Sequence, residues 1–355
     1  MSIRNRTTAG VLLLALTTLG LVACGGGSGG GGGSAMGAMS VSLTDAPLDD
    51  AQEVWIQVRG IAFKREGAAP EVVQNLTPSP RRLDLLEYQQ GRVAVLLDHV
   101  PFEAGRYEWL RLIVDTEANV RDSYLMIDGQ ECELRVPSGS ESGLKLNRGF
   151  TVPASGSLAL TIDFDLRKSV HAPPGQASGA CAQGYLLRPT LRVVDDAAVG
   201  ALAGQVTFAS GSVPVDCRPR LYVYEGTVTP DDLEESTAAN PDVDPLAVVE
   251  VEIPDGGSTG TYKAAFLPGG SYTAAFTCDD DTSADETLAF TPAAGMAVTV
   301  QNNLITQGDI TVPAPAGSYV YHRAGGIHYD GAKGEETVIQ VWGMGPATSI
   351  PAERK

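Results

Sequence analysis

Apolar and polar residues alternate with a period of two along most of the chain from residue 40 onwards. In residues 53–63 the apolar residues Val54, Ile56 and Val58 alternate with Trp55, Gln57 and Arg59, and in residues 158–166 an apolar side chain stands at every second position. Alternation at this period is typical of a β-strand with one buried face. Only residues 83–97 leave room for a short helical turn. The pattern therefore predicts an all-β fold.

The predicted strands fall into two groups, which indicate two consecutive β-sandwich domains over residues 40–198 and 199–313. Both groups contain the same local feature, in which a proline- and glycine-rich turn enters a strand and a tyrosine follows. The tyrosines are Tyr107 and Tyr272, and each is expected to pack back on its turn. Residues 314–355 are expected to form a short C-terminal hairpin.

Residues 1–23 have the layout of a signal peptide. Arg4 and Arg6 precede an apolar stretch over residues 11–22, which is too short to span a bilayer. The stretch ends in Leu21-Val22-Ala23-Cys24 and resembles the lipobox of bacterial lipoproteins. That resemblance implies acylation of Cys24, anchoring in the lipid bilayer, and an outer-membrane lipoprotein that faces the periplasm or the cell surface. Residues 24–39 follow as the lipidated cysteine and a glycine- and serine-rich tether.

Four further cysteines, Cys132, Cys181, Cys217 and Cys278, would lie in an oxidising compartment. Four cysteines allow three pairings. Because one pair falls in each predicted domain, we expect the disulfides Cys132–Cys181 and Cys217–Cys278. The alternative is that some of them are free buried thiols.

The formal net charge is −18, from 43 acidic and 25 basic residues. Residues 200–313 carry most of the excess, with 17 acidic and three basic side chains. This balance argues against a nucleic-acid partner, which would require a surplus of lysine and arginine.

Residues 40–196 resemble a bacterial surface lipoprotein family whose N-terminal domain has no known function. The resemblance is carried by Val41-Ser42-Leu43-Thr44-Asp45-Ala46-Pro47, Gly143-Leu144-Lys145-Leu146, Asp163-Phe164-Asp165 and Leu187-Arg188-Pro189. It implies no activity and no catalytic residues.

Two further resemblances concern the rest of the chain. Gly204-Gln205-Val206 and Leu267-Pro268-Gly269 with Tyr272 are similar to transthyretin- or carboxypeptidase-regulatory-like sandwiches, which are grouped with carbohydrate-binding-like folds. Tyr321-His322-Arg323, Tyr329-Asp330-Gly331 and Val341-Trp342-Gly343 are similar to the opening hairpin of pullulanase-associated modules that bind α-glucans. The fold alone does not determine a function.

Aromatic residues beside basic residues are the candidate binding groups. Trp55 with Arg59 and Trp109 with Arg111 stand on the less apolar faces of two predicted strands. If these strands are neighbours, they form one patch that stacks on a sugar ring or holds an anion. Two tyrosines of one strand, Tyr222 and Tyr224, and the tail residue Trp342 are further candidates. The alternative is that these rings cover a second hydrophobic layer.

Asp163 and Asp165 are two apart on one strand, so their carboxylates leave one face roughly 7 Å apart. That spacing overlaps the range for paired glycosidase acids. The alternative is that they face solvent or pair with Lys145, Arg188 or Arg192.

The acidic stretches around Asp242 and Asp244 and around Asp279 and Asp281 offer the oxygen ligands that calcium prefers. The alternative is two solvated acidic loops, and no other cofactor is indicated.

The sequence contains no catalytic motif, and we expect a protein without enzymatic activity. The function best supported is binding or adhesion in the cell envelope, with a polysaccharide as the ligand. The alternatives are a structural surface stalk, or the non-catalytic N-terminal part of a truncated glycan-degrading enzyme of the pullulanase type. Binding predicts an exposed aromatic platform, whereas a stalk predicts polar faces and rigid domain packing.

Overall fold

The structure, a computed structural model, describes residues 35–314 except 46–47, 49–50, 68–70, 115–121, 136–143, 177–179, 189, 234–242 and 282–287. The lipobox cysteine Cys24 and the tail residue Trp342 therefore lie outside the described residues. Almost all regular elements are strands, which confirms the all-β prediction. None of the described helices is long and apolar enough to cross a membrane.

Residues 36–195 build two sheets, together called the first sandwich. One sheet has the strand order β14-β11-β1-β5. Its strands are β1 (Met36–Asp45), β5 (Ala94–Glu103), β11 (Ser157–Asp165) and β14 (Thr190–Asp195).

The other sheet of the first sandwich has ten strands, with the path β10-β6-β2-β7-β8-β13-β12; β3 and β4 pair with β2, and β9 pairs with β6. Its strands are β2 (Glu53–Arg65), β3 (Glu71–Asn75), β4 (Arg81–Asp84), β6 (Gly105–Val114), β7 (Tyr124–Ile127), β8 (Gln130–Arg135), β9 (Leu144–Leu146), β10 (Phe150–Val152), β12 (Val170–His171) and β13 (Tyr185–Leu187). Two short helices interrupt this half of the chain, η1 (Leu85–Tyr88) and α2 (Leu166–Ser169). The turn η1 falls in the one stretch where a helical turn was predicted.

Residues 199–312 build two four-stranded sheets, together called the second sandwich. One has the order β18-β15-β21 with β22 also paired to β15, and the other has the order β17-β16-β19-β20. The strands are β15 (Val199–Phe208), β16 (Arg220–Glu225), β17 (Ala247–Glu250), β18 (Thr259–Pro268), β19 (Gly270–Thr277), β20 (Thr291–Val300), β21 (Ile305–Gln307) and β22 (Ile310–Val312).

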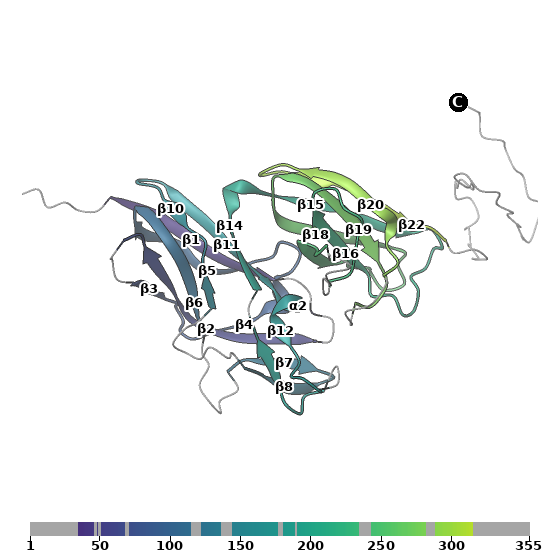
Figure 1. Ribbon diagram of the computed structural model, residues 1–355, viewed down its shortest axis with the longest axis horizontal. Coiled ribbons are helices and arrows are strands. Elements are labelled where there is room, and N and C mark those ends of the chain that lie inside the picture. The colour runs from purple at the N-terminus through teal and green to yellow at the C-terminus, as the bar shows by residue number, and fades with distance from the viewer. Residues whose placement is uncertain are drawn as a thin grey trace, which may run out of the picture.

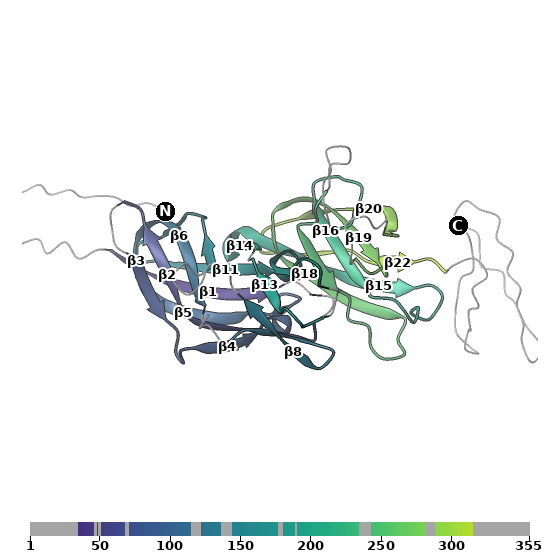
Figure 2. The same cartoon turned by 60° about the horizontal axis from the view of Figure 1, so that its bottom comes forward.

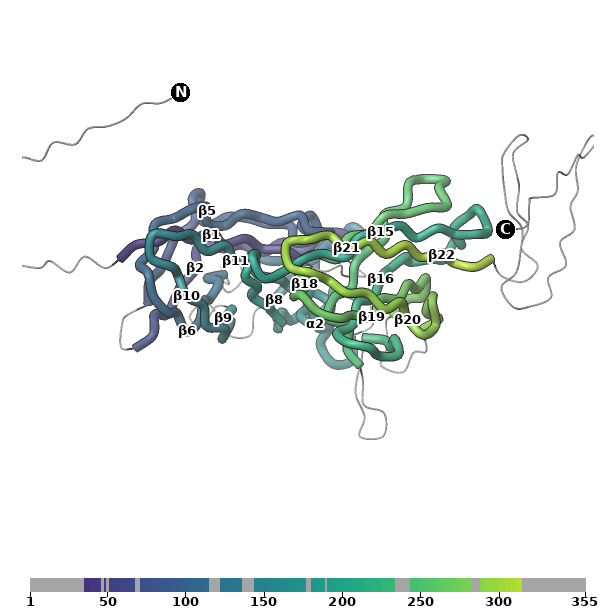
Figure 3. The backbone as a smooth tube through the Cα atoms, turned by 90° about the horizontal axis from the view of Figure 1, so that it is seen from above, coloured from purple at the N-terminus to yellow at the C-terminus, as the bar shows by residue number. Residues whose placement is uncertain are grey.

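The two sandwiches follow one another along the long axis of the molecule, as Figures 1, 2 and 3 show from three directions. The short helix η2 (Asp196–Ala198) connects β14 to β15. Within the described part of the chain, no sheet combines strands from both sandwiches.

The alternating residues bury the faces that their period predicts. In β11, the apolar residues from Leu158 to Phe164 at every second position are at most 8% exposed, while Asp163 and Asp165 of the alternate positions are only partly buried. Both expected disulfides are present, and each lies within one sandwich: Cys132–Cys181 and Cys217–Cys278.

The predicted contact of tyrosine with its turn is present in both sandwiches. The hydroxyl of Tyr107 donates to the carbonyl oxygen of Glu103 at 3.0 Å, and that of Tyr272 donates to the carbonyl oxygen of Pro268 at 2.6 Å. In each case the acceptor stands four residues before the tyrosine. Each ring is almost fully buried, so the hydroxyl fixes the turn from inside the sandwich.

The joint between the sandwiches is centred on Arg167. Its helix, α2, lies where the two halves meet in Figure 1. Nη1 of Arg167 donates to the hydroxyl of Tyr222 in β16 at 2.9 Å, and its Nη2 lies 3.0 Å from Oδ2 of Asp281. The Tyr222 hydroxyl donates to the same Oδ2 at 2.6 Å. The side chains of Arg167 and Asp281 are 4% and 1% exposed. Burial raises the pKa of Tyr222, so its hydroxyl remains protonated and available as a donor.

Weaker polar contacts surround this buried centre. Lys168 Nζ lies 2.6 Å from Oδ2 of Asp244, and Arg92 Nη2 lies 3.8 Å from Oε1 of Glu252. Because these side chains are partly or largely exposed to water, they contribute little to stability. The Arg167 contacts are therefore the principal polar link across the joint.

Replacing either tyrosine of the turns by phenylalanine removes one intramolecular hydrogen bond. We expect Tyr107→Phe and Tyr272→Phe each to lower the free energy of unfolding by about 1 kcal/mol, measured by urea denaturation. Tyr124→Phe is the matched control, because that hydroxyl contacts only exposed Arg82 at 3.3 Å among the contacts described. Equal stability of all three variants and the parent chain would contradict the role assigned to the buried hydroxyls.

Arg167→Ala leaves Asp281 buried without its cation. We expect it to lower the free energy of unfolding by about 3–5 kcal/mol and to separate the thermal unfolding of the two sandwiches in calorimetry. Lys168→Ala, one residue further along the same helix, should cost about 1 kcal/mol or less because its ion pair is partly solvated. A similar loss in both variants would show that the buried contacts do not hold the joint.

Candidate ligand-binding site

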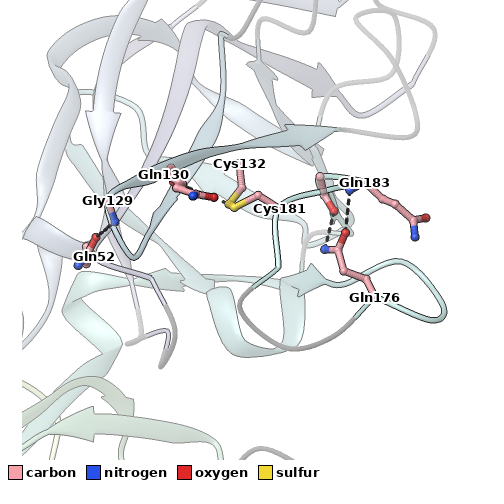
Figure 4. The surroundings of a disulfide bond; sticks show 8 residues. Gln52, Gly129, Gln130, Cys132, Gln176, Cys181 and Gln183 are labelled. Carbon is pink, nitrogen blue, oxygen red and sulfur yellow. Dashed lines mark hydrogen bonds between the residues drawn. A yellow bond between two sulfur atoms is a disulfide. The ribbon is translucent and has the colours of Figure 1, made fainter.

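The β7–β8 hairpin forms the base of the candidate site. Its strands pair up to Ile127 and Gln130, leaving Asp128 and Gly129 as a two-residue loop with φ values of 48° and 73°. Both residues with positive φ fit the turn type that matches strand twist in tight hairpins. The amide of Gly129 donates to Oε1 of Gln52 at 2.9 Å (Figure 4), which holds the loop against the chain entering β2.

An aromatic pair lies on the outer face beside this hairpin. Tyr124 of β7 stands directly opposite Trp55 of β2 on one side and Glu133 of β8 on the other. Paired residues of neighbouring strands project from the same face. The rings of Trp55 and Tyr124 stack with centroids 6.3 Å apart and planes inclined at 27°. Both side chains are half-buried, so each presents part of its ring to solvent.

The cation at this pair is Arg82, not Arg59 as predicted. The guanidinium carbon of Arg82 lies 5.1 Å from the Trp55 ring centre and 5.7 Å from that of Tyr124. Strand β4 pairs with β2 and places Arg82 opposite Gln57, whereas Arg59 stands four residues along β2 from Trp55. The pairing of β4 with β2 is long-range, so the local spacing of Trp55 and Arg59 did not reveal it.

A cavity of about 520 Å³ opens over β8, the strand that pairs with β7 and Tyr124. It is lined by Glu131, Glu133 and Arg135, which point outward from β8, and by residues 181–184. Since Glu133 is paired with Tyr124, the wall of the cavity and the aromatic pair are continuous on the sheet.

The wall formed by residues 181–184 is tied down at several points. Cys181 is bonded to Cys132 of β8, and Arg135 donates to the carbonyl oxygen of Gln183. The side chain of Gln176 donates to the carbonyl oxygen of Gly184 at 3.1 Å and accepts from the amide of Gln183 at 2.8 Å. Figure 4 shows the disulfide together with the glutamine contact. The cavity wall is therefore held in place without a ligand.

Trp109 and Arg111 form a second cluster on the same sheet face. Arg111 lies 5.3 Å from the Trp109 ring centre, and Nζ of Lys145 lies 4.6 Å from it. Strands β2 and β6 are neighbours, but Trp109 stands opposite Lys64, nine residues along β2 from Trp55. At about 3.3 Å per residue the two tryptophans are roughly 30 Å apart. The expectation of one joint patch was wrong, because the register separates them.

The prediction that Tyr222 and Tyr224 offer a binding face is also wrong. Both side chains are fully buried. Tyr222 belongs to the joint with Arg167, while Tyr224 donates to the carbonyl oxygen of Asp231 and packs against Phe290. This sheet face is covered by the loops around it and by the first sandwich, which periodicity within one strand does not reveal. The remaining candidate, Trp342, lies outside the described residues.

The two carboxylates of β11 are engaged in structural contacts. Asp163 accepts from Nε of Arg192 at 3.1 Å and also from Nη2 of that residue, which is one of the alternatives that the sequence left open. Asp165 caps α2 by accepting from the amide of Lys168 at 3.2 Å. Burial raises the pKa of Asp165, although the Lys168 amide partly opposes the shift.

The candidate calcium ligands have other partners. Asp244 pairs with Lys168 and Asp281 with Arg167, while Oδ2 of Asp279 accepts from the amide of Ala289 at 2.6 Å. Asp242 lies outside the described residues. Across the described ranges, no three His, Cys, Asp or Glu side chains are grouped so that they could hold a metal ion.

Residues 36–189 match the profile of a family described as "Domain of unknown function (DUF4382)". The match covers most of the first sandwich, including both aromatic clusters and the cavity. No curated protein matches the chain.

Several solved structures are distantly similar to the chain. They include a leucine-rich repeat protein from Bacteroides thetaiotaomicron (15% identity, TM-score 0.22, 79% of this chain and 26% of that one). The Bacillus anthracis TIE protein has 10% identity and a TM-score of 0.18, with coverage of 78% and 34%. The minor pilin GBS52 from Streptococcus agalactiae has 11% identity and a TM-score of 0.21, with coverage of 80% and 100%. The chain thus spans about a quarter of the first protein and a third of the second, and TM-scores this low do not establish a common fold.

The raised pKa of Asp165 predicts a specific pH dependence. The folded state binds this proton more tightly than the unfolded state, so the unfolding free energy falls as the pH rises through the folded pKa. Asp165→Asn keeps an oxygen acceptor for the Lys168 amide and removes the ionisation. We expect this variant to be more stable than the parent chain at pH 8, with the difference vanishing near pH 3.

Asp163→Asn provides the comparison for that measurement. It breaks the ion pair with Arg192. We therefore expect it to lower the free energy of unfolding at pH 8, whereas Asp165→Asn raises it. Urea denaturation of both variants at the two pH values checks the prediction. A loss of stability in Asp165→Asn at pH 8 would show that the ionised carboxylate is favoured by its surroundings.

Proposed function

We propose that the protein is a non-enzymatic lipoprotein of the bacterial cell envelope that binds a polysaccharide through the outer face of its first sandwich. Anchoring in the outer membrane through acylated Cys24 and exposure to the periplasm or cell surface are parts of this proposal. The observation that carries the binding function is the half-exposed Trp55–Tyr124 pair beside a preformed polar cavity.

The chemistry of the surface suits a sugar. A pyranose ring has faces of C–H bonds that pack on aromatic rings and a rim of hydroxyl groups that donate and accept hydrogen bonds. Trp55 and Tyr124 supply the aromatic surface, and Glu133 and Arg135 of the cavity supply a carboxylate acceptor and a guanidinium donor. Aromatic surface with a few fixed polar groups is the usual composition of a small-molecule site.

The contacts of Arg167 between the two sandwiches are consistent with this function. The Arg167 contacts fix the second sandwich relative to the first, so the binding face keeps one orientation along the molecule. The stalk and the binding protein are therefore compatible roles for the same chain. In the proposal the second sandwich is a spacer, and the first carries the ligand.

The proposal is tested by retention of the purified full-length chain on immobilised neutral polysaccharides, with an α-glucan and a β-glucan as the first probes. We expect Trp55→Ala and Tyr124→Ala each to weaken binding of the retained polymer by roughly tenfold, equivalent to about 1.4 kcal/mol. Ile305→Ala is the control, because it removes an exposed apolar side chain from the second sandwich, to which the proposal assigns no ligand.

Equal retention of Trp55→Ala and the parent chain, or retention on none of the polymers, would contradict the proposal. Shortened products released from a retained polymer would also contradict it. They would show that the chain hydrolyses the ligand instead of holding it. Circular dichroism of each variant confirms that any loss of binding is not a loss of folding.

A further inference from the structure

We propose that the Trp109 cluster, defined as Lys64, Trp109, Arg111 and Lys145, is a separate subsite for the acidic groups of a polysaccharide. The inference rests on the proposed glycan-binding function and narrows the ligand to a polymer that carries carboxylate or sulfate groups.

The four side chains of the cluster leave the same face of the ten-stranded sheet. Lys64 of β2 is paired with Trp109 of β6, and Arg111 of β6 is paired with Lys145 of β9. Trp109 and Arg111 are two residues apart on one strand, so they too share a face. Three strands therefore bring three cations around one half-buried indole ring.

The charge of this cluster is opposite to that of the chain. The protein as a whole carries a formal charge of −18, whereas the cluster has three basic side chains. Glu71 of β3 faces two of these cations: its Oε2 lies 2.6 Å from Nη2 of Arg111, and it stands opposite Lys64 of β2. No carboxylate among the described residues forms an ion pair with Lys145. A local positive field on an acidic protein attracts an anion and repels other acidic surfaces.

The cluster holds its cations in place before a ligand binds. The ammonium of Lys145 lies 4.6 Å from the Trp109 ring centre, within cation–π range. Arg111 is fixed on one side by the indole at 5.3 Å and on the other by Glu71. Because these side chains are already ordered, binding an anion costs less conformational entropy. Hydrogen bonds from charged donors to a carboxylate or sulfate are among the stronger ones in proteins.

The position of the cluster indicates a polymer as the ligand. The Trp109 cluster and the Trp55–Tyr124 pair lie on one sheet face, and the nine residues of β2 between them correspond to roughly 30 Å. One extended polysaccharide chain can reach both, and engaging two linked subsites raises the observed affinity above that of either alone. A small free anion would gain nothing from this arrangement.

The experiment compares two polymers that share a backbone and differ in charge: polygalacturonate and its methyl ester. The full-length chain is passed over each, at low and at moderate salt. We expect tighter retention on the acidic polymer, by about tenfold, and loss of that advantage in salt because ionic contacts are screened. Lys145→Gln should remove most of the advantage and leave retention on the ester unchanged.

Arg218→Gln is the matched control, since it removes one positive charge from the second sandwich, where Arg218 faces Asp280. An equal effect of Arg218→Gln and Lys145→Gln would overturn the subsite, because net charge alone would then explain retention. Equal retention on both polymers would also overturn it while leaving the proposed function standing. Retention on the acidic polymer that depends on Lys145 but not on Trp55 would support the subsite and contradict the first platform.

Discussion

The relative position of the two sandwiches depends on one buried charge. Arg167 has lost nearly all contact with water, and its guanidinium gains hydrogen bonds and an ion pair with Tyr222 and Asp281 of the other sandwich. A buried ion pair adds little net stability compared with apolar packing, but it tolerates few geometries because each unmet bond is costly. This requirement favours one relative orientation of the sandwiches. Each sandwich has its own hydrophobic core, and the joint holds the two together as one elongated body.

The proposed binding surface lies on the outer face of the ten-stranded sheet. The apolar side chains of the alternating strands point from its inner face into the core. The side chains on the outer face are not needed for the core. Trp55, Tyr124 and Trp109 are all partly buried on this face, and each ring has a basic side chain over it. The cavity beside β8 adds hydrogen-bonding groups that a flat sheet lacks.

Particular residues show how far sequence reasoning extended into this structure. The alternation in β2 and β11, both disulfides and both tyrosine–turn contacts follow from local spacing and from pairing within a domain, and Arg192 was among the expected partners of Asp163. The site was only partly predictable: Trp55, Trp109 and Arg111 were identified, but Arg82, Tyr124 and Glu133 were not. The pair Asp128-Gly129 between alternating residues is a recognisable hairpin signal, and it would have placed Tyr124 opposite Glu133.

The sequence by itself determined the all-β class and the buried faces of the alternating strands, because both depend on a repeat of two residues. It also favoured the two disulfides that the structure shows, because one cysteine pair falls in each predicted domain. Only the tertiary structure decided which strands are neighbours and in what register. That register placed Arg82 rather than Arg59 at Trp55 and set Trp109 nine residues along β2. It also buried Tyr222 against Arg167. Contacts of this kind join residues far apart in the chain, and a pattern within one strand contains no information about what will cover it.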